Sequence, residues 1–254
     1  PEMTRRGYKR HMSMGPILGT GGLAMIIPPS ALAVLLASLA EIDIGKLLIA
    51  GVLPGIILAI LYSILIYVQV KIDPDAAPEY TVEPHSFGQI IKSIVVNVLP
   101  MSLVVFCVIG LIILGVATPT EAAGFGALGV VVLAVIYRVL TWDIIVKSFA
   151  GSLRVTAMVL LIILASSTFS QLLAFTGASA GLIEWATQVK LSPLLMLLIM
   201  FAVLLVLGMF MDQVSMMLLT VPIFFPLAVT LQFDLTWFGL VMLLALEISL
   251  TTPP

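Results

Sequence analysis

The stretch "GGLAMIIPPS", residues 21–30, places two consecutive prolines inside an apolar run. Proline lacks a backbone N–H and clashes with the preceding turn, so a helix that reaches Pro28 and Pro29 must break there. The surrounding chain of 254 residues is 61% hydrophobic and only 9% charged, with a mean hydropathy of +1.26. A soluble domain cannot bury that much apolar surface, so the composition indicates an integral membrane protein. Broken backbone at membrane depth is tolerated only where it is buried in protein or lines a cavity. The two prolines therefore predict a helix break that is buried in protein or lines a cavity within the membrane.

Eight apolar blocks approach or reach the length needed to cross a membrane as helices. They cover residues 14–39, 47–70, 94–116, 122–140, 155–173, 192–211, 214–231 and 237–250, the first being the block with the prolines. Residues 192–231 fit either two full spans or one re-entrant hairpin. Residues 141–154 predict a separate amphipathic helix lying at the membrane interface. The pattern as a whole predicts an all-α polytopic membrane protein.

The basic residues are distributed unevenly between the two sides of the predicted membrane. If the spans are threaded alternately, nine of the eleven Lys and Arg residues fall on the side where the chain starts, and only Lys46 and Lys190 fall on the other. That side is therefore predicted to be cytoplasmic. A net charge of −2 and basic residues confined between apolar blocks argue against nucleic-acid binding, and the single cysteine, Cys107, excludes an internal disulfide.

A second Pro-Pro closes the sequence at residues 253–254. Segments 1–29 and 226–254 have equal length, begin with Pro and end with Pro-Pro, but only the first carries a basic cluster. This contrast predicts an inverted-topology repeat, in which interrupted helices at matching places mark the binding site of a transporter. We expect residues 1–70 to belong to the first repeat, 71–93 to form a cytoplasmic connector and 94–254 to form the second repeat.

Four motifs carry a resemblance to a known family. They are "GPILGTGGLAMIIPPS" (15–30), "ATPTEAAGFGAL" (117–128), "GMFMDQVSMMLLTVPIFFP" (208–226) and "LEISLTTPP" (246–254). In this order and spacing, they resemble the large membrane subunit of tripartite ATP-independent periplasmic (TRAP) transporters. The resemblance implies an elevator-type secondary transporter with re-entrant hairpins and Pro-Pro-broken helices in a bacterial or archaeal inner membrane. It further implies sodium-coupled import of a small organic acid, delivered by a periplasmic binding protein, with a small membrane subunit as partner and no other cofactor.

The same resemblance implies two ion- and substrate-binding regions. The first comprises Gly19, Thr20, Pro28, Pro29 and Ser30, and the second comprises Gly208, Asp212, Thr251, Thr252 and Pro253. Sodium is expected chiefly at the hydroxyls of Ser30, Thr251 and Thr252. Members of the family extend further at both ends, so a hairpin before Pro1 and a helix after Pro254 are expected to be missing here. Ser249 stands where the family often has glycine.

Three carboxylates permit two interpretations each. Asp212 is predicted to act at the ion site, with a helix N-cap as its alternative. Glu247 lies in an apolar stretch and either orients the second break or pairs with a neighbouring helix. Glu121 fits a capping box opened by Thr118, with Pro119 in the first turn, and this structural role is preferred.

Two other classes of protein remain as alternatives. "GASAG" (177–181) fits the G-x-S-x-G pattern, so an intramembrane serine hydrolase using Ser179 is conceivable, although both histidines thread to the opposite side. A passive membrane scaffold subunit would explain the apolar blocks but not the paired breaks. "GFGALG" (124–129) lies inside a predicted span and favours close helix packing over a nucleotide site.

Overall fold

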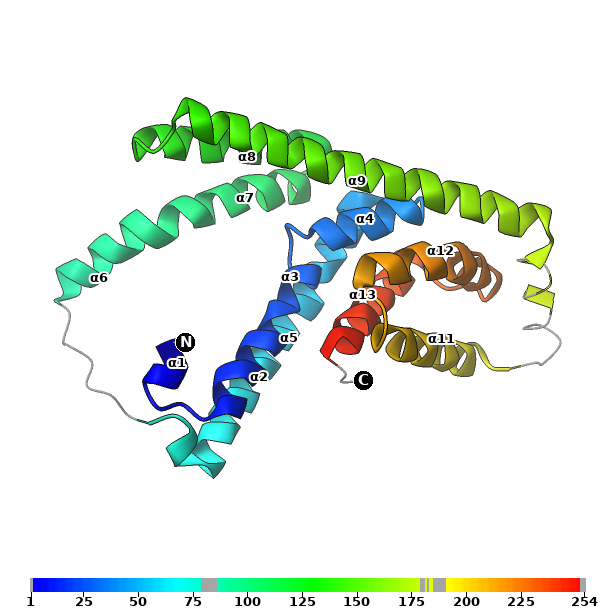
Figure 1. The fold of residues 1–254 in the computed structure, drawn as a ribbon, viewed down its shortest axis with the longest axis horizontal. Coiled ribbons are helices and arrows are strands. Elements are labelled where there is room, and N and C mark those ends of the chain that lie inside the picture. The colour runs from blue at the N-terminus through cyan, green and yellow to red at the C-terminus, as the bar shows by residue number, and fades with distance from the viewer. Residues whose placement is uncertain (1, 79–85, 179–180, 182, 185–190, 252–254) are drawn as a thin grey trace. The chain divides into compact units, whose positions relative to one another are not determined.

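The computed structural model describes residues 2–78, 86–178, 181, 183–184 and 191–251. These residues form helices and contain no strand, which confirms the all-α prediction (Figure 1). Residues 1–29 and 53–144 form one compact unit, and residues 30–52 and 145–254 form the other. The units reflect packing within the chain and leave the predicted division into repeats untested.

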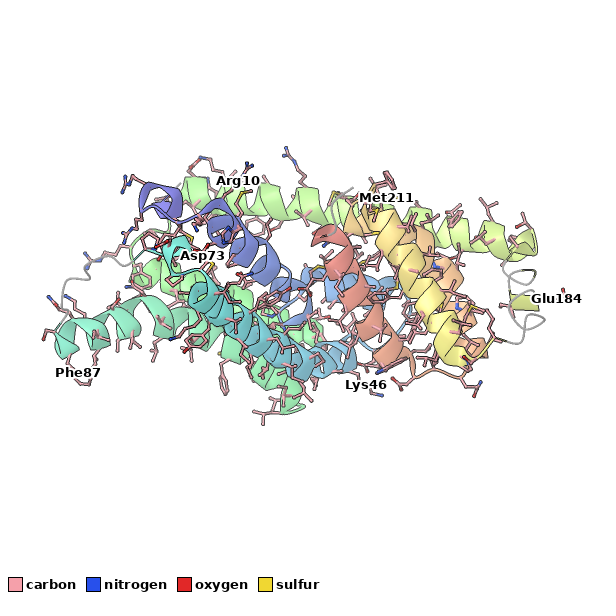
Figure 2. All side chains as sticks on the ribbon, turned by 90° about the horizontal axis from the view of Figure 1, so that it is seen from below. Arg10, Lys46, Asp73, Phe87, Glu184 and Met211 are labelled. Carbon is pink, nitrogen blue, oxygen red and sulfur yellow. The ribbon has the colours of Figure 1, made fainter. Side chains whose placement is uncertain are left out.

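In the first unit, the start of the chain packs along helix α5 (Ile44–Ile72). Helices α1 (Glu2–Arg5), α2 (Arg10–Gly21) and α3 (Leu23–Ile26) precede the first Pro-Pro. Gly19 of α2 lies against the ring of Tyr62, and Ile27 lies against Gly55, so two glycines permit close approach. Asp73 directly follows α5 and is labelled in Figure 2. It forms an ion pair with Lys9, whose Nζ atom lies 2.6 Å from Asp73 Oδ2. A short 3-10 turn, η1 (Pro74–Ala76), comes next.

The following span is a continuous helix with one wide turn. Helix α6 (Phe87–Ser93) runs through the π-helical turn η2 (Ile94–Val98) into α7 (Leu99–Ile113). Pro100 has no N–H to donate, and the Leu99 N–H donates to the Ile94 carbonyl five residues earlier. The helical hydrogen bonds therefore change from the α to the wider π pattern beside the proline. The Tyr137 hydroxyl donates to the Val96 carbonyl within this turn.

Helix α8 (Pro119–Ile136) packs against α7. Thr118 and Glu121 form the predicted capping box, with the Thr118 N–H donating to Glu121 at 2.8 Å. Gly126 lies directly against Val108, and a side chain at Gly129 would contact Val104 at 3.4 Å. The predicted packing role of "GFGALG" is therefore confirmed at these two glycines.

Besides the first turns of α5, the described residues of the second unit form helices from both parts of the chain. They are α4 (Ala31–Leu39), α9 (Trp142–Phe175), α11 (Pro193–Gly208), α12 (Gln213–Thr230) and α13 (Leu235–Thr251). Helix α12 packs against α4, α11 and α13, and 44% of its span is buried, against 11% or less for the spans of α5 to α9. Helix α12 therefore forms the centre of this unit.

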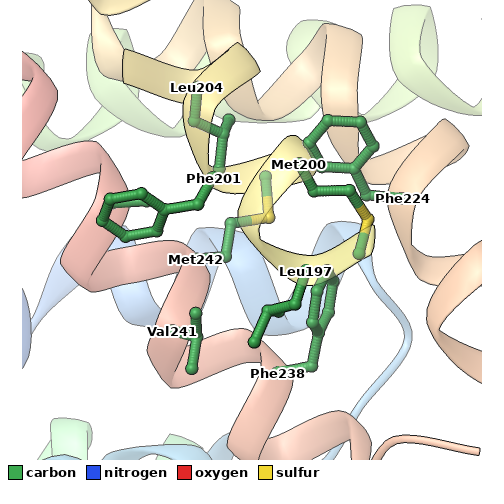
Figure 3. A pocket seen from close by; sticks show the side chains of 9 residues that line it. Leu197, Met200, Phe201, Leu204, Phe224, Phe238, Val241 and Met242 are labelled. Carbon is green, nitrogen blue, oxygen red and sulfur yellow. The ribbon is translucent and has the colours of Figure 1, made fainter. Parts of the chain in front are cut away.

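The interface between α11, α12 and α13 is an apolar core. Figure 3 shows the side chains that surround a small void of about 10 Å³ at this interface. They include Leu197, Met200, Leu204, Phe224, Phe238 and Met242. The void is at the lower limit for one water and its lining is apolar, so these three helices pack closely.

All eight predicted apolar blocks are helical, but one predicted boundary is wrong. Five helices are long and apolar enough to span a membrane, or six if α2–α3 and α4 count as one broken span, while α11 and α13 are shorter. The separate interfacial helix predicted at 141–154 is the beginning of α9, which continues without interruption to Phe175. No proline lies between residues 142 and 175, and Gly151 adopts helical geometry, so nothing ends the helix at Arg154.

Candidate functional site

The first predicted break is present between α3 and α4. Ile27 and Ser30 have extended backbone, with φ/ψ of −76°/121° and −112°/115°, and the peptide bond between Pro28 and Pro29 is cis. Because neither proline has an N–H, they cannot donate the bonds that the carbonyls of residues 24 and 25 would accept in a continuous helix. The prediction that Pro28 and Pro29 interrupt a helix is confirmed.

Ser30 has a structural role that the sequence interpretation missed. The residue is 3% exposed, and its hydroxyl oxygen accepts a hydrogen bond of 3.1 Å from the Ala33 N–H. Ser30 is thus the N-cap of α4. The signal was available in the sequence, since serine directly before an apolar run is a common helix start. Sodium binding by Ser30 stays a prediction.

Gly19 and Thr20 lie within α2, away from the break. A Cβ at Gly19 would lie 2.8 Å from Tyr62 Cε1, so this glycine permits the helix crossing. The Thr20 hydroxyl donates to the Pro16 carbonyl at 2.6 Å. Thr20 precedes Pro28 by eight residues, more than two helical turns, so the structure does not bring Thr20 to the prolines.

The second region begins where α11 approaches α13. Gly208 is the last residue of α11, and a Cβ built on it would collide with Cβ and Oγ of Ser249. Ser249 is fully buried, and its hydroxyl donates to the Leu246 carbonyl at 2.8 Å. The structure therefore brings Gly208 next to the last turn of α13, which ends at Thr251. This proximity between residues 41 positions apart could not be read from the sequence.

Asp212 is the N-cap of α12. One carboxylate oxygen accepts hydrogen bonds from the N–H groups of Val214 and Ser215, at 3.0 and 3.1 Å, and the other accepts from the Ser215 hydroxyl. Asp212 is exposed and lies between α11 and α12, and the Ser215 hydroxyl is the main reason why its pKa is below the ordinary value. The structure thus shows Asp212 in the alternative role considered from the sequence, as a helix N-cap. A role in ion binding stays a prediction.

Three predicted residues fall where the structure is not described. Thr252 and Pro253, of the second region, and Ser179, of the hydrolase alternative, lie outside the described residues. Thr251 is described only through its backbone in α13. Among the described residues, no group of three or more His, Cys, Asp or Glu side chains could hold a metal ion. The oxygens near the described break are hydroxyls and carbonyls, a donor type suited to a hard monovalent cation.

The whole chain, residues 1–254, matches the model of one protein family, described as "Tripartite ATP-independent periplasmic transporter, DctM component". The chain belongs to this TRAP transporter family. Membership confirms the resemblance seen in the motifs and makes the chain part of a multi-pass membrane transport component. Because the family is not an enzyme family, the serine hydrolase alternative is wrong.

Individual TRAP relatives are similar over almost the entire chain. A C4-dicarboxylate TRAP transporter large permease protein of Pseudomonas aeruginosa is 33% identical over 99% of this chain and 58% of its own length. A C4-dicarboxylate large permease of Rhodobacter capsulatus is 30% identical over 100% of the chain and 60% of its own length. A sialic acid TRAP permease of Haemophilus influenzae is 28% identical over 99% of the chain and 40% of its own length. The chain thus spans little more than half of the first two relatives.

Proposed function

We propose that this chain supplies the ion- and substrate-binding part of a TRAP permease that imports a small organic acid, driven by sodium. The observation that carries the proposal is the break at Ile27–Ser30, which interrupts an apolar segment in a chain of this transporter family. Interrupted helices free backbone carbonyls for cations and present helix N-termini to anionic groups. The approach of Gly208 to the last turn of α13 supports a second region of the same kind.

A carboxylate-bearing substrate fits the names of the relatives. C4-dicarboxylates and sialic acid all carry carboxylate groups, and the two relatives named for C4-dicarboxylates are 33% and 30% identical to this chain. We therefore propose a C4-dicarboxylate as the first substrate to test. A periplasmic binding protein would deliver it, a small membrane subunit would brace the permease, and an elevator movement in the inner membrane would carry it across.

Sodium-dependent uptake in proteoliposomes tests this proposal. The vesicles contain the full-length permease, the small subunit and the binding protein, and the initial uptake rate of labelled succinate is measured against external sodium concentration. We expect saturable uptake that needs an inward sodium gradient. An uptake rate that does not depend on the sodium concentration would overturn the proposed sodium coupling. Uptake of sialic acid but not succinate would overturn the proposed substrate.

A pair of variants tests the second region. Thr252→Val retains the shape of the side chain but removes its hydroxyl, so the sodium concentration for half-maximal uptake should rise several-fold at unchanged protein level. Thr230→Val is the matched control, because the Thr230 hydroxyl already donates to the Pro226 carbonyl within α12. If both variants show the same sodium dependence, Thr252 does not contribute to the ion site.

A further inference from the structure

Glu247 is a buried carboxyl group in an apolar helix. The residue is 4% exposed, and its Oε2 atom is covered and accepts no hydrogen bond from the described residues. Within the described part of the chain, it is the only buried side-chain oxygen or nitrogen without a partner. Leaving a buried polar atom without a hydrogen-bond partner is unfavourable, and more so if the group is charged.

The helices around Glu247 offer no opposite charge. Helix α13 packs against α4, α11 and α12, none of which contains Lys, Arg, His, Asp or Glu, and Glu247 is the only ionisable residue of α13 itself. The charged residues nearest along the chain lie beyond the helix ends: Glu41, Asp43 and Lys46 after α4, Asp212 before α12 and Asp234 before α13. The pairing with a neighbouring helix considered from the sequence therefore has no partner in these three helices.

Helix geometry separates Glu247 from these charged ends. Gly239 lies against Leu47, next to Lys46, and precedes Glu247 by eight residues, which is about 12 Å along α13. Ala245 and Ser249 face α11, and Glu247 lies two residues from each, roughly 200° around the helix. Glu247 therefore points away from α11 and from the Gly208–Asp212 junction.

We propose that Glu247 binds a proton in this packed arrangement, so that a neutral carboxylic acid lies between the packed helices α4, α11, α12 and α13. An ionised carboxylate without a partner is far more expensive to bury than the protonated acid, so the group takes up a proton instead. The proton comes from water as the helices pack, and it returns to water if this face of α13 becomes hydrated. Glu247 thereby makes the packing of the unit sensitive to pH. This inference does not depend on sodium coupling.

Infrared spectroscopy of the full-length permease in lipid tests the proton directly. At neutral pH, the wild-type protein should show the C=O stretching band of a protonated carboxyl group, and ¹³C-labelled glutamate should shift that band. Glu247→Gln should remove the band, whereas Glu41→Gln, the same substitution at an exposed residue, should leave it. A wild-type spectrum without the band, or a band that Glu247→Gln retains, would overturn the proposal. Absence of the band from the labelled wild type would overturn the proposal even if the variant fails to fold.

The pH dependence of melting provides a second readout. A buried acid that is neutral when folded stabilises the protein at low pH and loses this contribution as the pH rises and the unfolded state releases the proton. The wild-type Tm should therefore fall by several degrees relative to Glu247→Gln between mildly acidic and alkaline pH. Parallel melting curves would show that Glu247 is not coupled to packing. Failure of sodium-driven uptake with the infrared band intact would overturn the proposed function alone.

Discussion

Two junctions between apolar helices in this chain have the same length but different construction. Residues 27–30 connect α3 to α4, and residues 209–212 connect α11 to α12. Each junction ends in a side chain that caps the next helix, Ser30 in the first and Asp212 in the second. The first contains two prolines and a buried hydroxyl, whereas the second contains no proline and an exposed carboxylate.

The difference shows that one junction is set by local backbone chemistry, whereas at the other a distant helix lies against the end of α11. Prolines interrupt the first segment whatever surrounds it, because they cannot donate helical hydrogen bonds. Helix α11 ends at Gly208, where the backbone lies against Ser249 of α13. A buried hydroxyl leaves the first junction electrically neutral, whereas a carboxylate is tolerated at the second because it is exposed and accepts three hydrogen bonds.

The largest effect is expected from filling the contact at the second junction. Gly208→Ala would place a methyl group on the Ser249 side chain and should destabilise the protein by about 1–3 kcal/mol, measured as a lower Tm. Adding Ser249→Gly should restore part of the loss by removing the atoms that collide. Gly151→Ala, in α9, is the matched control because nothing lies within 4 Å of its Cβ position, and it should be neutral or stabilising. Equal Tm values for Gly208→Ala and Gly151→Ala would refute the contact.

Asp212 should show a smaller effect that separates capping from function. Asp212→Ala removes the cap and should lower stability by about 0.5–2 kcal/mol, whereas Asp212→Asn keeps an acceptor oxygen and should lose less. We expect Asp212→Asn to impair uptake while the protein level is preserved. Normal uptake by Asp212→Asn would show that Asp212 acts only as the N-cap of α12.

Low pH should weaken the contribution of the Asp212 carboxylate to the stability of the folded protein. The Ser215 hydrogen bonds stabilise the carboxylate and lower its pKa, so the stabilisation is present above the pKa of the unfolded chain and is lost as the pH falls through the lowered folded value. The Tm difference between wild type and Asp212→Asn should therefore shrink on acidification. A difference that grows toward acid pH would contradict this sign.

The proline junction offers a test of similar or smaller size at Ser30. Ser30→Ala removes the hydroxyl that accepts from Ala33 and should cost about 1 kcal/mol. Ser192→Ala is the matched control, because Ser192 caps α11 through the Leu195 N–H and belongs to neither junction. If Ser30 also serves sodium, only Ser30→Ala should raise the sodium concentration for half-maximal uptake. Identical sodium curves would leave Ser30 as a cap alone.

The smallest effect is expected at Thr20. Its hydroxyl donates to the Pro16 carbonyl, as that of Thr230 donates to the Pro226 carbonyl, and such bonds to the preceding turn add little stability. Thr20→Val and Thr230→Val should therefore both change stability by less than about 0.5 kcal/mol. A selective loss of sodium dependence in Thr20→Val would place Thr20 in the ion site despite its distance along α2 from the prolines.

The sequence by itself determined the features that depend on neighbouring residues. Apolar length predicted the helices, Pro28 and Pro29 predicted the first break, and Thr118 with Glu121 predicted a capping box, because each rests on backbone bonding within a few positions. The caps at Ser30 and Asp212 are equally local, but the sequence interpretation preferred ion binding for both. For Ser30 it followed the family resemblance, and for Asp212 it also followed the expectation that a carboxylate between apolar blocks is functional. The false boundary at Arg154 came from a change in polarity, which alters a helix surface without ending its hydrogen bonds.

Only the tertiary structure decided which distant residues meet. The fit of Ser249 onto Gly208 depends on how α11 and α13 cross, and no local pattern encodes that crossing. The isolation of Glu247 likewise became visible only when α4, α11 and α12, all without charge, were found packed on α13. Residues close along the chain share backbone bonds that sequence can specify, whereas residues far apart meet through side-chain packing, which depends on the complete fold.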